Sequence, residues 1–181
     1  MVPWGKENVI LVKPDASYAD EIASYRTEML LANSSMDGTG MLRRMENPLD
    51  WLNNNKLMEH PDTVPKNKVP ATQFVLTDPE TKRIYGMLQV RHLLNDYLRN
   101  FAGNIGYSVR PTERRKGYAE KMLKLALKFC KEELGMERVL ISCLVENEAS
   151  RRTILACGGV FEEKVYEHIE NVWLEKYWIS L

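Results

Sequence analysis

The chain has 181 residues, 44% of them hydrophobic and 28% charged, which suits one globular domain with a sizeable core. Lysine plus arginine and aspartate plus glutamate each total 25, so the overall charge points to neither a nucleic acid nor an anionic membrane as partner. The N-terminus lacks a signal-peptide pattern, no run approaches the roughly 20 apolar residues of a membrane span, and Cys130, Cys143 and Cys157 form no CxxC pair. We therefore expect a cytoplasmic protein with reduced thiols and no metal site.

The first half of the chain alternates β-rich runs with helical patterns. Ser17 and Asp20 have the spacing of a capping box, which predicts a helix start at Ser17. Pro48 suits the first turn of a second helix. The predicted strands are residues 8–13, 71–78 and 83–94, and the predicted helices are residues 18–32 and 47–60.

The second half continues the same alternation. Its predicted strands are residues 104–111, 137–145, 160–166 and 171–181, and its predicted helices are residues 119–134 and 147–159. The run ERVLISCLV has almost no polar alternation, which is typical of a strand buried on both faces. Asn147 and Gly158 suit the two ends of the last helix. Without a repeat or a dividing linker, residues 1–181 are predicted to form one α+β domain.

Three cations gather where the long third helix begins, at Arg114, Arg115 and Lys116, directly before Gly117. A helix N-terminus already carries about half a positive charge, so each added cation costs on the order of 0.3–1 kcal/mol unless an anion answers it. Gly117 lets a ligand approach the backbone closely. The turn therefore predicts a diphosphate site. It matches neither GxxxxGK[ST] nor GxGxxG, and a solvated basic turn is the alternative.

The segment RRKGYA, residues 114–119, matches the Q/R-x-x-G-x-G/A signature of the GCN5-related N-acetyltransferases (GNAT). GYSVRP before it resembles that family's fourth strand, and RVLISCLVENEAS resembles its fifth strand with the asparagine that follows. The resemblance covers residues 72–166, and the whole chain is more loosely similar to a group of bacterial predicted acetyltransferases. It implies a central, mostly antiparallel twisted sheet of about six to seven strands flanked by helices, with the cofactor wedged between splayed strands 4 and 5.

The resemblance implies acetyl-CoA as acetyl donor, with its pyrophosphate on the signature turn and its pantetheine arm beside the fourth strand. The implied cofactor-binding residues are Tyr107, Ser108, Val109, Arg114, Arg115, Lys116, Gly117, Tyr118, Ala119, Asn147 and Ser150. Many relatives carry a tyrosine general acid seven residues after the asparagine. Ile154 stands at that position, so the role does not transfer, and Tyr166, Tyr177 or a water could replace it.

The acceptor amine must lose a proton before it can attack. An amine with a pKa of about 10.4 costs roughly 4 kcal/mol to deprotonate at pH 7, so a base or a water relay is useful. Glu146, just before Asn147, and His92, at the end of the third strand, are the candidate catalytic bases. Glu146 could instead favour the helix dipole, and His92 could be a hydrogen-bonded residue at a strand end.

The expected function is acetyl transfer from acetyl-CoA to a small-molecule or peptide amine, directly within a ternary complex, by a monomer or homodimer. The alternative is a catalytically inactive acyl-CoA-binding or regulatory module on the same fold. A nucleic-acid interface on the basic helix is the third reading. The lysines of that helix lie opposite its apolar face, which is typical of a solvated surface, so no nucleic-acid partner is expected.

Overall fold

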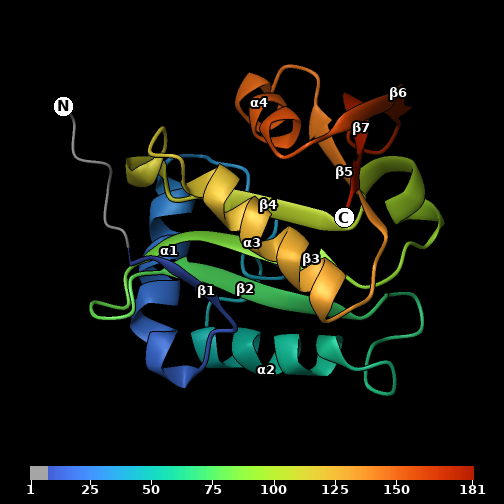
Figure 1. The fold of residues 1–181 in the computed structure, drawn as a ribbon. Helices are drawn as coiled ribbons and strands as arrows, with labels where there is room; N and C mark the ends of the chain where they lie inside the picture. The colour runs from blue at the N-terminus through green and yellow to red at the C-terminus, as the bar shows by residue number, and fades with distance from the viewer. Residues whose placement is uncertain (1–7) are drawn as a thin grey trace.

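A computed structural model describes residues 8–181, which form seven strands and four α-helices (Figure 1). Every strand and α-helix expected from the sequence is present. In chain order they are β1 Ile10–Val12, α1 Ala19–Leu31, α2 Pro48–Glu59, β2 Ala71–Thr77, β3 Ile84–Arg91, β4 Ile105–Val109, α3 Tyr118–Glu132, β5 Arg138–Leu144, α4 Glu148–Ala156, β6 Val160–Glu167 and β7 Val172–Ser180. None of these helices has the length and apolarity needed to cross a bilayer.

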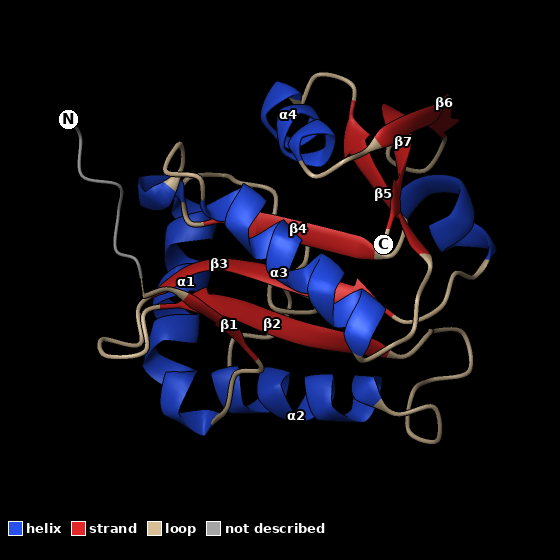
Figure 2. Ribbon diagram, in the orientation of Figure 1, coloured by secondary structure: helices blue, strands red, loops and turns tan. Residues whose placement is uncertain are grey.

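The first four strands form one antiparallel sheet in the order β1-β2-β3-β4. Helices α1 and α2 pack on one face of it, around buried Ile22, Tyr25 and Trp51. Figure 2 shows α3 lying across the other face. There Met122 and Ala126 contribute to the larger hydrophobic core. The helices therefore close both faces of this sheet.

The last three strands form a second sheet in the order β5-β7-β6, in which both pairs are antiparallel. The expected mostly antiparallel arrangement is confirmed, but it is divided into two sheets that separate between β4 and β5. In Figures 1 and 2 the second sheet and α4 lie together beyond β4. This division positions the candidate site, because it interrupts strand pairing in the middle of the molecule.

Two local features differ from the sequence expectations. The predicted start of a helix at Ser17 is wrong in detail, since Asp15 accepts the Ser17 N–H at 2.8 Å and caps a short 3-10 turn that precedes α1. Both residue types cap helices well, so local sequence does not choose between them. The π-helical turn Leu98–Ala102 was not expected, and the Gly103 N–H closes it by donating to the Leu98 carbonyl at 2.6 Å.

Candidate functional site

Strands β4 and β5 meet at one end and separate toward the other. Asn104 N–H donates to the Leu140 carbonyl at 2.6 Å, and Leu140 N–H donates to Asn104 Oδ1 at 2.8 Å. Beyond this contact the two strands belong to different sheets. Ile105 is buried, whereas the remaining four residues of β4 are only partly buried although the strand lies centrally. A gap therefore opens between the C-terminal halves of β4 and β5.

The register of β4 determines which of its backbone groups face this gap. Arg110 N–H donates to the Tyr85 carbonyl at 2.9 Å, toward β3. Backbone groups alternate sides along an antiparallel strand, so Ser108 also pairs with β3. Tyr107 and Val109 then direct their N–H and C=O groups into the gap. Of Tyr107, Ser108 and Val109, therefore, only Tyr107 and Val109 have backbone groups that face the gap.

The facing edge of β5 follows from the same argument. Val145 N–H donates to the Trp173 carbonyl at 3.0 Å, toward β7. Ser142 and Leu144 are offset from Val145 by odd numbers of residues, so their backbone groups turn toward β4. Both residues are partly buried. The gap is thus bordered by hydrogen-bonding backbone on both sides, as an extended ligand requires.

The signature turn lies where β4 leaves the gap. Gly117 precedes α3 with φ of 80°, a left-handed conformation, and no side chain caps the helix there. Nothing lies within 4 Å of the position that a Cβ on Gly117 would occupy. Arg115 also has a positive φ, 62°. The turn therefore presents the positive end of α3 to open space, as the diphosphate prediction requires.

The basic side chains of the turn have three different environments. Arg114 donates from Nε to the Val109 carbonyl at 3.2 Å and from Nη2 to Ser34 Oγ at 2.7 Å. Lys116 pairs with Glu113 at 2.8 Å, and this hydrogen bond raises the pKa of the lysine. Arg115 is exposed and has no carboxylate within ion-pair distance among residues 8–181. Glu113 therefore neutralises only part of the positive charge of the turn.

A buried ion network holds the end of β4 from behind. Arg110 is 1% exposed and donates to Glu21 at 2.9 Å, to Glu28 at 3.2 Å and to the Ile84 carbonyl at 2.7 Å. Glu28 also accepts the N–H and the hydroxyl of Thr112, at 3.1 and 2.6 Å. Helix α1 is thereby fastened to the two residues on either side of Pro111, just before the signature turn.

Two hydroxyl groups meet across the gap. Tyr107 Oη lies 2.9 Å from Ser150 Oγ, which joins β4 to α4. Burial raises the pKa of Tyr107 to about 12, so its hydroxyl keeps its proton at ordinary pH. Either oxygen can be the donor. The pair places a protonated hydroxyl beside the backbone edge of β4. Local sequence could not indicate this contact, because the two residues lie 43 positions apart.

The end of β5 carries Glu146 and Asn147, both exposed. Asn147 Oδ1 accepts the Ser150 N–H at 3.1 Å, so the side chain caps α4 as expected. Its amide nitrogen can still donate to a ligand. Glu146 lies in the turn between β5 and α4, at the open end of the gap. The structure therefore brings both residues to the same end as the signature turn.

His92 lies elsewhere. Its Nε2 is 2.8 Å from Thr72 Oγ1 on β2, the strand on the opposite side of β3 from β4. Burial lowers the pKa of His92, although the nearby Glu59 carboxylate opposes the effect. The contacts of His92 thus tie together strand ends at the far side of the sheet from the gap.

The other tyrosines named from the sequence are engaged in the second sheet. Tyr177 donates to Glu175 at 2.7 Å, and Tyr166 donates to Asn171 at 3.1 Å. Ile154 is fully buried in the larger core cluster. A side chain at position 154 therefore points into packed core, and the Tyr107–Ser150 pair is the hydroxyl group that the structure brings to the gap.

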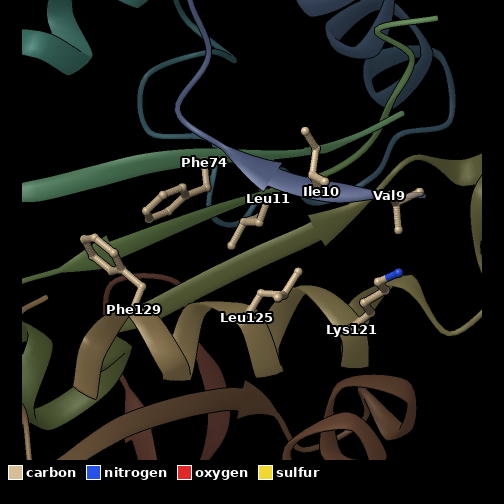
Figure 3. A pocket seen from close by; sticks show the side chains of 7 residues that line it. All are labelled: Val9, Ile10, Leu11, Phe74, Lys121, Leu125 and Phe129. Carbon is tan, nitrogen blue, oxygen red and sulfur yellow. The ribbon is translucent and has the colours of Figure 1, made fainter. Parts of the chain in front are cut away.

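An apolar pocket of about 340 Å³ lies apart from the gap (Figure 3). Its walls come from β1, β2 and α3, and Lys121 is its one charged lining residue. The lining residues are Val9, Ile10, Leu11, Phe74, Lys121, Leu125 and Phe129. Because β1 is at the opposite edge of its sheet from β4, this pocket and the gap are separate features.

Comparison with known proteins agrees with the geometry. A model of the acetyltransferase (GNAT) domain matches residues 8–160. The uncharacterized N-acetyltransferase YoaA of Bacillus subtilis (strain 168) is 27% identical over 93 residues, which are 49% of this chain and 51% of YoaA. The match thus spans about half the length of that curated relative.

Solved structures share the fold over nearly the whole chain. The ribosomal-protein-S5-alanine acetyltransferase from Vibrio fischeri has a TM-score of 0.73 at 18% identity, covering 99% of this chain and 97% of that one. The microcin C7 self-immunity acetyltransferase MccE, solved with acetyl-CoA and AMP, has a TM-score of 0.70 at 18% identity and covers 99% and 98%. Mutant forms of the spermidine/spermine N-acetyltransferase SpeG from Vibrio cholerae have a TM-score of 0.67 at 14% identity and cover 97% and 95%. Because the family model covers most of its length, the chain belongs to the GNAT acetyltransferase family, whose acetyl donor is acetyl-CoA.

Proposed function

We propose that the protein is an N-acetyltransferase that moves the acetyl group of acetyl-CoA directly to a primary amine. The observation that carries the proposal is the gap between β4 and β5, which ends at the N-termini of both α3 and α4. Its backbone edges suit the extended pantetheine arm, and its open end suits a diphosphate. The solved structures that share the fold include a ribosomal-protein-S5-alanine acetyltransferase and a spermidine/spermine N-acetyltransferase, which supports an amine acceptor.

In this proposal the backbone amides of residues 115–119 hold the pyrophosphate, and Arg115 adds charge to that end. The pantetheine arm pairs with the gap-facing groups of Tyr107 and Val109. Arg114 already occupies the Val109 carbonyl, so the Val109 N–H is the group of this residue that remains for the ligand. Directed at the thioester carbonyl, this N–H stabilises the oxyanion that forms when the amine attacks.

The reaction requires two proton movements. The amine nitrogen bonds to the thioester carbon, the carbon–sulfur bond breaks, and the amine loses a proton while the departing thiolate gains one. Glu146, at the open end of the gap, is the proposed base, directly or through water. His92 is the weaker candidate, because it contacts Thr72 on β2, away from the gap. The Tyr107–Ser150 pair is the proposed acid for the thiolate.

Direct transfer is favoured over an acetyl-cysteine intermediate. Burial raises the pKa of Cys143 to about 11 and that of Cys130 to about 12, so both thiols stay protonated and weakly nucleophilic. Burial likewise raises the pKa of Cys157. Arg151 near Cys143 and Lys124 near Cys157 act to lower the pKa of these thiols, but burial outweighs both cations, so neither thiol is activated as a nucleophile.

One observation favours the second candidate, a binding module without turnover. Position 154, where many relatives place their general acid, holds a fully buried isoleucine. A protein that had lost this acid could bind acetyl-CoA and fail to transfer the acetyl group. The Tyr107–Ser150 pair is the reason that we prefer the enzyme.

Release of CoA in the presence of pooled amines, amino acids and peptides separates the two candidates. The enzyme releases CoA faster with one of the acceptors than without any, and its initial rates give intersecting lines when both substrates are varied. Cys143→Ala should retain most of the kcat. Tight acetyl-CoA binding without acceptor-dependent release supports the binding module, whereas parallel lines and a trapped acetyl-cysteine contradict direct transfer.

A further inference from the structure

Arg91, the last residue of β3, lies beside the N-terminal part of β4. Its Nη1 donates to the Gly103 carbonyl at 3.1 Å. Its Nη2 lies 3.3 Å from the position that a Cβ on Gly106 would occupy. Gly106 is the neighbour of Tyr107, whose backbone faces the gap. The guanidinium therefore lies against the N-terminal end of β4.

Arg91 lies on the face of β4 opposite α3, the face that we assign to the acceptor. Alternation along β4 places Tyr107 and Val109 on the α3 side, where both pack against the larger core cluster. Gly106 and Arg91 lie on the other side, where the loop containing Gly38 crosses the strand. A Cβ on Gly38 would be only 2.1 Å from the Gly106 carbonyl oxygen, so only a glycine lets the loop pass this close to β4. The Arg91 guanidinium is largely buried beside these glycines.

Arg91 differs from Arg110, the other inward-facing arginine of the sheet, in its ion-pair partners. Arg110 has two carboxylates within 3.2 Å. Among residues 8–181, no carboxylate lies within 4.0 Å of the Arg91 guanidinium, and the Asp37 carboxylate acts on it only from longer range. Burial lowers the pKa of Arg91. Burying a cation that has no ion-pair partner costs free energy on folding, and a bound anion would offset that cost.

We propose that Arg91 binds the carboxylate of the acceptor, and that the acceptor is a small amine carrying a carboxylate, as a free amino acid does. This inference rests on the proposed function. A guanidinium presents paired N–H donors that match a carboxylate, and among residues 8–181 Arg91 donates one hydrogen bond, to the Gly103 carbonyl. Gly106 adjoins Tyr107, whose backbone faces the gap, so in this proposal the carboxylate on Arg91 and the amine in the gap belong to the same small molecule. A polyamine has no carboxylate that could bind Arg91.

Binding of product-like ligands to the CoA-loaded protein tests the inference without requiring turnover. N-acetylglycine and N-acetylglycinamide differ in the carboxylate alone. Calorimetry or ligand-observed NMR should show about 10- to 100-fold tighter binding of the acid by the wild type, in line with a charge-assisted hydrogen bond. Arg91→Gln should abolish that preference and Arg91→Lys should retain part of it. Arg99→Gln, which changes a more exposed arginine of the neighbouring turn, is the control and should behave as wild type.

The inference is overturned if the wild type binds both ligands equally, binds neither at saturation, or keeps its preference in Arg91→Gln. Thermal melting confirms that each variant is folded. Acetyl-CoA affinity, measured first on the same preparations, distinguishes a failure of the proposed function from a failure of the Arg91 role. Loss of acetyl-CoA binding by the wild type contradicts the proposed function, whereas normal acetyl-CoA binding without carboxylate preference contradicts only the role of Arg91.

Discussion

Tyr107 and Ser150 place their hydroxyl oxygens 2.9 Å apart, across the gap that separates the two sheets of this protein. The contact joins the strand whose backbone borders the gap to the helix that carries Asn147 and Ile154. It also brings a protonated hydroxyl to a place where position 154 offers only a buried aliphatic side chain. In the proposed mechanism, these two residues supply the proton that the departing thiolate takes up.

Tyr107→Phe should lower kcat by about 100-fold if the hydroxyl pair protonates the thiolate, because general acids contribute on that scale. The Km for acetyl-CoA should change little, since the backbone of residue 107 is retained. Steady-state kinetics with both substrates measures this. Tyr166→Phe is the matched control, because its hydroxyl bonds Asn171 in the second sheet. An unchanged kcat in Tyr107→Phe would rule out the proposed acid.

Gly117→Glu should abolish acetyl-CoA binding, because a side chain and a like charge would occupy the phosphate position. The left-handed backbone adds a strain of about 1–2 kcal/mol. Gly135→Glu controls for that strain, since Gly135 also has a positive φ, 62°, and equally open space beyond the other end of α3. Calorimetry on both folded variants should show loss of binding only for Gly117→Glu. Equal affinities would refute the assignment of the turn.

Asn147 has two functions that different substitutions separate. Asn147→Asp keeps the oxygen that caps α4 and removes the amide donor, so it should stay stable and bind acetyl-CoA more weakly, by roughly 1 kcal/mol. Asn147→Ala should lose both properties. Calorimetry and thermal melting measure the two effects. Wild-type affinity in Asn147→Asp would leave the residue as a helix cap alone.

Glu28 should make stability depend on acid pH. Burial opposes its ionisation, but the hydrogen bonds from Thr112 and Arg110 outweigh it and hold the pKa of this carboxyl below its usual 4.5. A depressed folded-state pKa stabilises the protein above the unfolded-state value, and that contribution is lost as pH falls through the folded-state value. The free energy of unfolding of Glu28→Gln should therefore decline less between neutral pH and the acid range.

Chemical denaturation at several pH values measures this slope. Glu132→Gln removes a carboxylate from the exposed end of α3 and serves as the control. If Glu28→Gln and the wild type lose stability in parallel as pH falls, the network that fastens α1 to the end of β4 does not act through the Glu28 charge.

Much of the fold could be predicted because its signals are local. The run of residues 137–145 indicated a buried strand, and β5 is Arg138–Leu144. Gly117 indicated a turn that tolerates positive φ, and the structure gives it 80°. The spacing of apolar residues after it indicated the amphipathic helix α3, whose lysines at 124, 128 and 131 are exposed. Each inference needed only neighbouring residues.

What the sequence did not provide depends on residues far apart in the chain. Arg110 and Glu21 are 89 residues apart, and nothing near either one indicates that they pair. Among residues 8–181, no carboxylate lies within 4.0 Å of the Arg91 guanidinium. No local sequence pattern can show this. The choice of Tyr107 and Val109 over Ser108 required the register of β4 against β3. The site chemistry is therefore largely tertiary, whereas its scaffold is largely local.

The account depends most on the claim that acetyl-CoA occupies the gap between β4 and β5. Amide hydrogen exchange, measured by NMR with and without acetyl-CoA, tests it residue by residue. Acetyl-CoA should slow exchange at Tyr107, Val109 and residues 115–119, and should leave Leu11, Phe74 and Leu125 around the apolar pocket unchanged. Protection of the pocket residues, with exchange at Tyr107 and Val109 unaltered, would contradict the account.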